Sequence, residues 1–179
     1  MAKILGINEL KNWVKKNDAK LRSGSVIYQG SAFGRRLITG HNAVIRENNI
    51  IGDDVIIGTN SYLGPGNKIG NNVKIHTDCF LEGVTLADMV IISPHVVFTN
   101  DPYPPCRICT EKVGGATVGK NTVIGSNATI LPGIKIGANV LIGAGSVVTR
   151  NVADGLVVIG NPANVLKKRS ELVHKHKAK

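Results

Sequence analysis

The fold is decided by residues 118–148, VGKNTVIGSNATILPGIKIGANVLIGAGSVV. An aliphatic residue returns at every sixth position of this stretch, and glycine often follows it. Outward from it, the same register reaches back to Ile27 and gives eighteen units, sixteen of which begin with Ile, Leu or Val. The unit at 81–85 is one residue short, and residues 98–117 leave the register. A fixed short period over this length predicts a solenoid.

Each unit is expected to form one short strand and one tight corner. The first residue of a unit points inward and stacks on the residue three units later, because three units complete one triangular turn. Gly, Asn and Asp recur at the corners, where the backbone angles are difficult for other residues. The predicted fold is therefore an all-β parallel β-helix of about six turns that spans residues 25–163.

Both ends of the chain are basic. Six of the 22 Lys and Arg residues lie in residues 1–24 and six in 164–179, so the formal charge of +10 belongs mainly to the ends, and no nucleic-acid partner is expected. Residues 1–24 predict a short amphipathic helix, and residues 164–179 a basic tail in solvent or beside a phosphorylated ligand. Neither a membrane span nor a secretion signal is predicted, which favours a cytoplasmic protein. The expected apolar side of the helix comprises Ile4, Leu5, Ile7, Leu10, Trp13 and Val14.

The interruption at 98–117 is predicted to be a functional loop ejected from the prism. With three units per turn, one face is expected to carry the units that begin at Thr39, Ile57, Ile75, Ile92, Ile130 and Val148. Their fourth positions would form a column of Asn42, Asn60, Asp78, His95, Gly133 and Asn151. This register places Asp78 and His95 one turn apart, with His76 on the same face and the loop beside them. Alternatively, these are corner residues that bond only to neighbouring backbone.

The three cysteines do not form a disulfide framework of the kind found in small secreted proteins. Cys79 occupies a fifth position and is expected to be buried. Cys106 and Cys109 form a C-x-x-C pair in the loop, but a structural zinc site needs four ligands. We therefore expect no metal, and the sequence leaves open whether this pair is oxidised.

The C-terminal block, TVGKNTVIGSNATILPGIKIGANVLIGAGSVVTRNVADGLVVIGNPANVL at 117–166, resembles the acetyl-CoA-binding end of the hexapeptide-repeat acyltransferases. The resemblance implies a left-handed β-helix, a homotrimer, and acetyl-CoA bound as co-substrate in a groove between two prisms. It places small residues beside the pantetheine arm, namely Gly125, Ser126, Gly143 and Ala144. It also places Arg150 and Lys167 near the phosphates, and the turn Asn161–Pro162 near the adenine.

The middle segment, KIHTDCFLEGVTLADMVIISPHVVFTNDPYPP at 74–105, is similar to the nucleotide-amino-sugar N-acetyltransferases. That similarity implies a nucleotide-linked amino sugar as the acceptor, with Asp78 and Asn100 orienting its amine. His95 or His76 would then take the proton, and the acceptor would be contacted by Thr77, Glu82 and Asp101. The chain departs from that group at His76, Asp78 and His95, where Gln, Asn and Asn are common.

Two further readings stay open from the sequence. Related enzymes that acetylate sugar hydroxyls usually carry a histidine in the loop as general base, and this loop has none, which favours N-acetylation. An O-acetyltransferase remains the alternative, because His95 paired with Asp78 could supply a base from the prism. A β-helical carbonic anhydrase needs three histidines around zinc. His41 and His76 could be two of them, but Leu81 stands where the third is required, which disfavours this alternative. A non-enzymatic β-helix is disfavoured by the loop and the C-terminal block.

Overall fold

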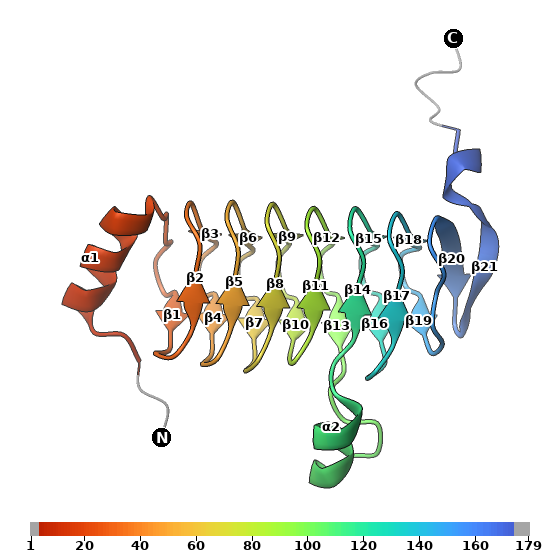
Figure 1. Ribbon diagram of the computed structural model, residues 1–179, viewed down its shortest axis with the longest axis horizontal. Helices are drawn as coiled ribbons and strands as arrows, with labels where there is room; N and C mark the ends of the chain where they lie inside the picture. Colours follow the sequence, from red (N-terminus) through yellow and green to blue (C-terminus); the bar gives the residue numbers. More distant parts are fainter. Residues whose placement is uncertain (1–3, 174–179) are drawn as a thin grey trace.

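The computed structural model describes residues 4–173, and in it the chain coils into a prism with a parallel sheet along each of its three sides (Figure 1). This confirms the predicted all-β parallel β-helix. The coil has nearly seven turns instead of six. One extra unit begins at Phe98, whose aromatic side chain takes a position that aliphatic residues hold in most other units, and another strand is added after residue 155.

Each side of the prism is named here after its first strand. The β1 face comprises β1 (Val26–Ile27), β4 (Val44–Ile45), β7 (Tyr62–Leu63), β10 (Phe80–Leu81), β13 (Val97–Phe98), β16 (Thr129–Ile130) and β19 (Val147–Val148). The β2 face comprises β2 (Ala32–Phe33), β5 (Ile50–Ile51), β8 (Lys68–Ile69), β11 (Thr85–Leu86), β14 (Thr117–Val118) and β17 (Lys135–Ile136).

The β3 face is the third side. It comprises β3 (Ile38–Thr39), β6 (Ile56–Ile57), β9 (Lys74–Ile75), β12 (Ile91–Ile92), β15 (Val123–Ile124), β18 (Leu141–Ile142), β20 (Leu156–Gly160) and the antiparallel β21 (Ala163–Lys168). The chain passes from the β3 face to the β1 face, then to the β2 face and back. We call the three corners the histidine edge (β3 to β1), the loop edge (β1 to β2) and the third edge (β2 to β3).

The two-residue strands explain the repeat. Successive side chains of a strand point to opposite faces, so the second strand residue enters the core and the first lies outside. Ile45, Ile57 and Leu63, for example, are fully buried. Stacked identical positions therefore form continuous aliphatic columns inside the prism, as the sequence predicted.

The corners use glycine for two different reasons. The fourth position of a unit adopts a left-handed backbone, with φ of 57° at Asn60 and 69° at Gly145. The glycines at second positions do not need a positive φ. A Cβ on Gly58 would lie 2.3 Å from the carbonyl carbon of His76 in the next coil, so glycine there allows the coils to stack closely.

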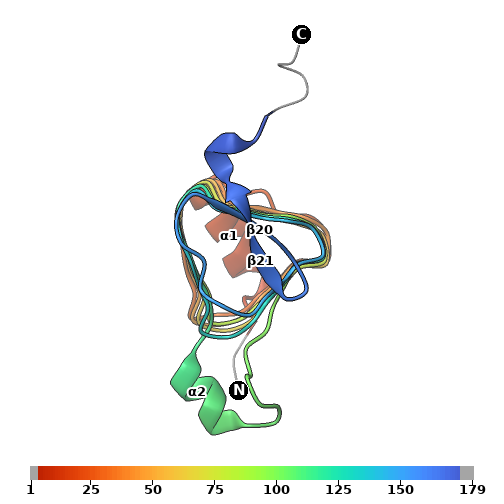
Figure 2. The ribbon, with the colours of Figure 1, turned by 90° about the vertical axis from the view of Figure 1, so that its right-hand side faces the viewer.

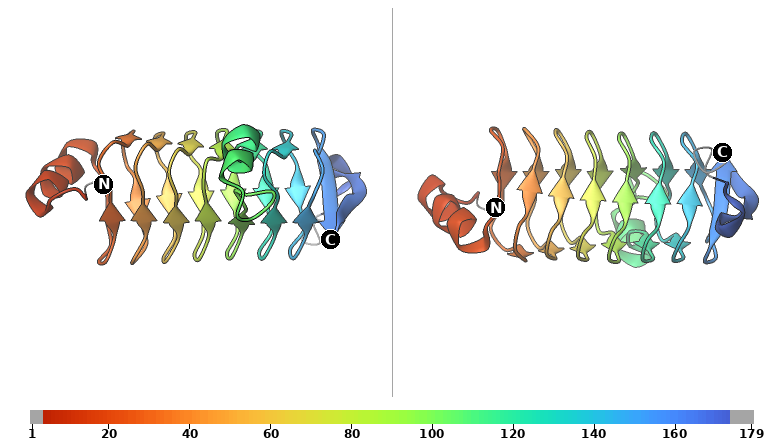
Figure 3. Two further views of the ribbon diagram at one scale, coloured as in Figure 1. Left: turned by 90° about the horizontal axis from the view of Figure 1, so that it is seen from below. Right: turned by 90° about the horizontal axis from the view of Figure 1, so that it is seen from above.

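Helix α1 (Ile7–Asn17) closes the N-terminal end of the prism, and the β20–β21 hairpin closes the other (Figure 3). Leu10, Trp13 and Val14 pack against the core as predicted, and Trp13 meets Phe33 edge to face at 4.9 Å. Leu5 also packs there but precedes the helix. Ile4 was predicted in the helix and is not; it pairs with Tyr28 and is half exposed. The side chain of Ile7 lies outside the described residues.

The ejected loop is shorter than predicted and runs from Thr99 to Ala116. Phe98 and Thr117, which we expected in the loop, belong to strands β13 and β14. The loop carries helix α2 (Arg107–Val113) and projects from the loop edge, away from the prism (Figure 2). Cys106 and Cys109 are joined by a disulfide at the start of α2, and Cys79 is free and buried.

The predicted C-terminal tail begins inside the fold. Residues 163–168 form β21, which pairs with β20, and the 3-10 helix η1 (Arg169–Glu171) follows. The Arg169 guanidinium donates to the carbonyl oxygens of Asn121 and Val140, which ties this segment to the third edge. The rest of the predicted tail, 174–179, lies outside the described residues. Within 4–173 neither α-helix is long and apolar enough to cross a membrane.

Candidate active site

Polar side chains stack along the histidine edge. Asn42, Asn60, Asp78 and His95 hold equivalent corner positions in four consecutive coils, each with a left-handed φ between 55° and 61°. The short unit at 81–85 follows Asp78 and does not disturb this register, because Ile92 pairs with Ile75 across the adjacent strands. Asp78 and His95 therefore lie in neighbouring coils, as predicted.

The carboxylate of Asp78 has defined partners. The side-chain amide of Asn60 donates to one oxygen at 3.1 Å, and the Thr77 hydroxyl lies 2.9 Å from the other. These hydrogen bonds, with a smaller effect from the charge of His95, hold the pKa of Asp78 below its ordinary value. Asp78 is thus an anion at neutral pH, half-buried and fixed in orientation.

His95 is exposed and adjacent to that anion. Its backbone N–H donates to the carbonyl of Thr77 at 3.0 Å, which fixes the corner. No hydrogen bond joins its ring to the Asp78 carboxylate in the described part of the chain, so the imidazole is accessible to a ligand. Its φ of 61° is the corner geometry that this fold repeats, and the coils before and after use Asp and Asn at the same position.

The C-terminal part of the predicted column is wrong. We expected Gly133 and Asn151 on this edge, from the units that begin at Ile130 and Val148. Those units lie on the β1 face, where Phe98 pairs with Ile130. The unit beginning at Phe98 was not counted, so every later unit moves by one side of the triangle. The column continues instead with Asn127 and Gly145.

This correction brings the predicted acetyl-CoA residues onto the same edge as His95. Gly125 and Ser126 lie in the next coil, and Gly143 and Ala144 in the one after. A Cβ on Gly125 would lie 2.6 Å from the backbone nitrogen of Ala144, so coil packing alone requires that glycine. Ala144 is exposed and Ser126 half-buried. Together these four residues form what we call the small-residue strip.

A hairpin turn ends the strip. The backbone N–H of Gly160 donates to the Ser146 hydroxyl at 3.2 Å, which fixes the turn of Asn161 and Pro162 at the end of the prism. Asp78, His95, the strip and this turn therefore follow one another along the histidine edge. At roughly 4.8 Å per coil, Asp78 lies about 14 Å from Ala144.

Two predicted phosphate contacts are not on this strip. Arg150 lies beyond β19 at the loop edge, where it lines a cavity of about 300 Å³ with Val152, Ala163 and Asn164. Lys167 lies on β21 opposite Val157. Neither side chain forms an ion pair among the described residues.

Asn100 and Glu82 lie at the foot of the loop. Both line a small cavity of about 160 Å³, together with Pro65 and Gly115. This cavity is at the loop edge, so one chain does not bring Asn100 to Asp78 and His95, contrary to the single edge that we expected. Asp101 is engaged within the loop, since its carboxylate accepts from the backbone N–H groups of Tyr103 and Cys106, each at 2.8 Å.

His76 and Thr77 border another cavity, of about 200 Å³, on the β3 face. Lys74 also lines it, a residue that no pattern in the sequence selects. Asn127 was likewise missed, although the corrected column identifies it, whereas Asn60 stood in the predicted column without a role in the predicted site. Among residues 4–173, no three His, Cys, Asp or Glu side chains gather around a possible metal position.

The fold and the repeat define a hexapeptide-repeat β-helix. The family model for the bacterial transferase hexapeptide (six repeats) matches residues 115–150, and that for the hexapeptide repeat of succinyl-transferase matches residues 48–81. The predicted resemblance to hexapeptide-repeat acyltransferases is thereby confirmed.

The chain is similar to the putative acetyltransferase YvoF of Bacillus subtilis, with 38% identity over 93 residues, 52% of each chain. It is also similar to a chloramphenicol acetyltransferase of Klebsiella aerogenes, with 46% identity over 59 residues, 33% of this chain and 28% of that protein. The chain thus spans about half, or less, of these relatives. The acetyltransferase domain of PglB from Neisseria gonorrhoeae, solved with acetyl coenzyme A, shares the fold, with a TM-score of 0.50, 21% identity, and coverage of 90% of this chain and 68% of that one.

Proposed function

We propose that this protein is an acetyl-CoA-dependent N-acetyltransferase that acts on the amino group of a nucleotide-linked amino sugar. The observation that carries the proposal is the continuity of the histidine edge. A fixed carboxylate and an accessible imidazole, Asp78 and His95, are followed in the next two coils by an open strip of small residues. The acetyltransferases among the relatives support an acyltransferase.

In the proposed reaction the amine attacks the thioester carbonyl of acetyl-CoA. A C–N bond forms, the C–S bond of the tetrahedral intermediate breaks, and CoA leaves as the thiolate. Asp78 accepts a hydrogen bond from the amine and orients its lone pair. His95 takes the amine proton and passes it to the departing sulfur. Backbone N–H groups at the strip would stabilise the oxyanion.

A complete site would require more than one copy of the chain. Asn100 and Asp78 lie on different edges of the prism, so a site that contains both takes one edge from each of two chains. This supports the homotrimer that the family resemblance implies. It also gives the ejected loop a role, since the cavity of Asn100 and Glu82 would then border the acceptor of a neighbouring chain.

The experiment that tests the function is an acceptor panel. Thiol release from acetyl-CoA is followed with UDP-, dTDP- and GDP-linked amino sugars and with matched sugars that carry a hydroxyl in place of the amine. We expect release with at least one amine. Release with hydroxyl acceptors alone would favour the O-acetyltransferase, which the adjacency of His95 and Asp78 keeps as the second candidate. Release with none would overturn the proposal.

Replacing Asp78 by asparagine is expected to lower kcat/KM for the amine about tenfold or more, because a charge-assisted hydrogen bond to the amine is lost. Asparagine tolerates the left-handed corner, as Asn60 and Asn127 show. Steady-state kinetics with the acceptor found in the panel measure the effect. Equal kinetics for both proteins would remove Asp78 from the site.

The same substitution has a defined pH signature in stability. Because the pKa of Asp78 is lowered in the folded state, its carboxylate stabilises the fold above the unfolded pKa of about 3.9. That contribution disappears as the pH falls through the lower folded value. The melting temperature of the wild type should therefore exceed that of Asp78→Asn at pH 7, and the difference should shrink as the pH falls below the unfolded pKa and vanish once Asp78 is protonated in the folded state. Thermal melts at several pH values test this.

Replacing Ala144 by tryptophan is expected to raise the KM for acetyl-CoA about tenfold or more, because the side chain is exposed on the strip and would occupy the path of the pantetheine arm. Ala138→Trp is the matched control, since Ala138 holds the same corner position on the third edge. Saturation kinetics and acetyl-CoA titration measure both variants. Equal losses in the two variants would point to damaged coils and not to a blocked groove.

A further inference from the structure

The outer side of the β3 face carries a continuous groove that none of the proposed reaction steps uses. A cavity of about 350 Å³ lies over the first coils, and the cavity of about 200 Å³ that reaches His76 and Thr77 adjoins it. Ile56 and Lys74 line both cavities. We call the combined depression the β3 groove.

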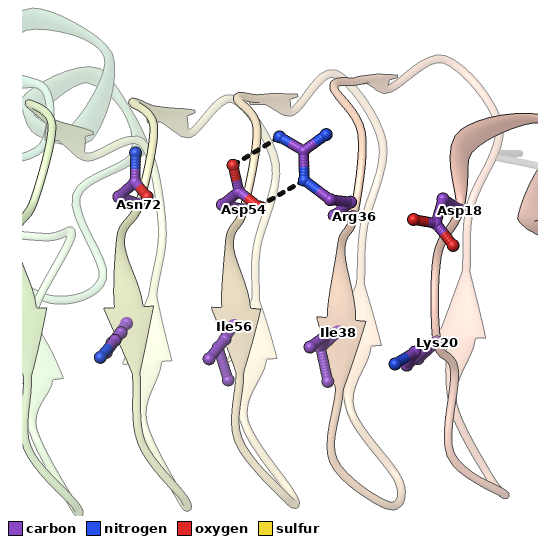
Figure 4. Close-up of a pocket in the computed structure, with 8 residues that line it drawn as sticks. Asp18, Lys20, Arg36, Ile38, Asp54, Ile56 and Asn72 are labelled. Carbon is purple, nitrogen blue, oxygen red and sulfur yellow. Dashed lines mark hydrogen bonds and ion pairs between the residues drawn. The ribbon is translucent and has the colours of Figure 1, made fainter.

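The floor of the groove is one row of outward-facing residues, Lys20, Ile38, Ile56 and Lys74. They are in register, since Lys20 pairs with Ile38, Ile38 with Ile56, and Ile56 with Lys74. Figure 4 shows Lys20, Ile38 and Ile56 in this order, and Lys74 follows Ile56, so two aliphatic side chains lie between two cations. Within the described chain neither ammonium group forms an ion pair, so both are available to an anion.

The rim of the groove lies along the third edge. Arg36 donates to both oxygens of Asp54, each at 2.6 Å, which neutralises these two charges against each other. Asn72 follows them in the next coil, and its side-chain amide makes no hydrogen bond within residues 4–173. An unpaired amide offers one acceptor and two donors, which suits the polar edge of a nucleobase.

The groove leads to the proposed reaction centre from the N-terminal side. His76 and Thr77, at its far end, are next to Asp78 in the chain, whereas the small-residue strip extends from His95 toward the C-terminus. Two ligands that lie along these paths would meet at Asp78 and His95. An acceptor whose amine is held there would extend its remaining portion over Lys74 and the isoleucines.

We propose that the β3 groove binds the nucleoside diphosphate of the acceptor. Lys74, which both cavities share, contacts the diphosphate, and the nucleoside lies against Ile38 and Ile56 with Asn72 at its polar edge. A ligand with an apolar ring beside a dianion matches an aliphatic floor that ends in a lysine. The assignment rests on the proposed function for the identity of the acceptor, but it concerns a binding site that can be measured without turnover.

The test is binding of UDP, dTDP and GDP by calorimetry, without acetyl-CoA. We expect at least one of them to bind the wild type. Lys74→Ala should raise the Kd about tenfold, and Lys74→Arg should raise it less. Lys68→Ala is the matched control, because Lys68 is the exposed outward residue of β8 on the β2 face. Ile56→Glu should weaken binding further, since it places a carboxylate on the floor.

Kinetics distinguish this proposal from the proposed function. With a nucleotide-linked acceptor, Lys74→Ala should raise KM about tenfold and leave kcat unchanged, the pattern of lost ground-state binding. If the wild type acetylates amino sugars and Lys74→Ala binds all three nucleotides as tightly as the wild type does, the nucleotide site in the β3 groove is wrong and the proposed function is unaffected. If nucleotide binding depends on Lys74 and no acetyl transfer is found, the nucleotide site is supported and the proposed function is wrong. Absence of nucleotide binding in the wild type also overturns the groove.

Discussion

Replacing His95 by asparagine is expected to lower kcat about 100-fold or more, because general-base catalysis by a positioned side chain contributes at least that much. The Asp78 carboxylate in the neighbouring coil stabilises the imidazolium that forms when His95 takes the proton. Asparagine is the informative substitution, because Asn60 and Asn127 adopt the same left-handed corner on this edge. The variant thus removes the imidazole and keeps the backbone.

The controls separate chemistry from folding. His41→Asn removes an exposed histidine from the same edge, two coils before His76, and should leave kcat unchanged. Melting temperatures of both variants should match that of the wild type within a few degrees. If His95→Asn retains full activity, the proton goes elsewhere, either to His76 or to the departing thiolate. His76→Asn distinguishes these two routes.

The acceptor decides how large the loss at His95 should be. A sugar amine is a nucleophile whenever its lone pair is free, whereas a hydroxyl needs a base at neutral pH. A loss near 100-fold therefore fits an amine, and a loss of several thousandfold would favour a hydroxyl. His95→Asn consequently reports on the choice between N- and O-acetylation as well as on the residue.

Much of the scaffold could be predicted from spacing, because each coil repeats one physical requirement. Each unit has an inward aliphatic residue, then a position where two coils approach closely, then a left-handed corner. The error arose at Phe98, where an aromatic residue followed by Thr-Asn resembled the start of a loop. Because three units make a coil, one uncounted unit turns every later residue by one side of the prism. That single error moved Gly133 and Asn151 onto the predicted edge and left Asn127 off it.

The candidate site was predicted less completely than the scaffold. The stacking of Asp78 and His95 follows from local register, which the sequence shows directly. The location of Asn100 depends on where a long loop leaves the prism, and the role of Lys74 depends on side chains that gather from separate coils. Neither has a local pattern. Buried polar residues were missed for a related reason, because the sequence does not distinguish a buried asparagine in a corner from an exposed one.

Replacing Asn67 by alanine is expected to lower the free energy of unfolding by about 3 kcal/mol or more, because several buried hydrogen-bonding groups lose their partner at 1–3 kcal/mol each. Asn67 is fully buried. Its side-chain amide donates to the Gly64 carbonyl and to Asn49 Oδ1, both at 2.8 Å, and its Oδ1 accepts from the backbone N–H of Val84 at 3.0 Å.

The position of Asn67 explains how the short unit is tolerated. The corner between β10 and β11 has only Glu82, Gly83 and Val84, one residue fewer than the corner of the coil below. Asn67 lies directly below this corner. Its side-chain oxygen accepts from the Val84 N–H, and its side-chain nitrogen donates to the Leu81 carbonyl at 3.4 Å. The side chain thus supplies bonds on both sides of the shortened corner.

Chemical denaturation measures the effect, with Asn71→Ala as the matched control. The exposed Asn71 side chain donates to the Asp88 carboxylate at 3.3 Å and accepts from the backbone N–H of Asp53 at 2.9 Å. Water can replace both partners, so its loss should cost only about 1 kcal/mol. Asn67→Ala should lower the denaturation midpoint without a comparable change in the control. Equal midpoints for the two variants would show that the coils accept a shortened unit without the hydrogen bonds of the Asn67 side chain. In that case the stacked strands alone would hold Glu82 at the foot of the loop.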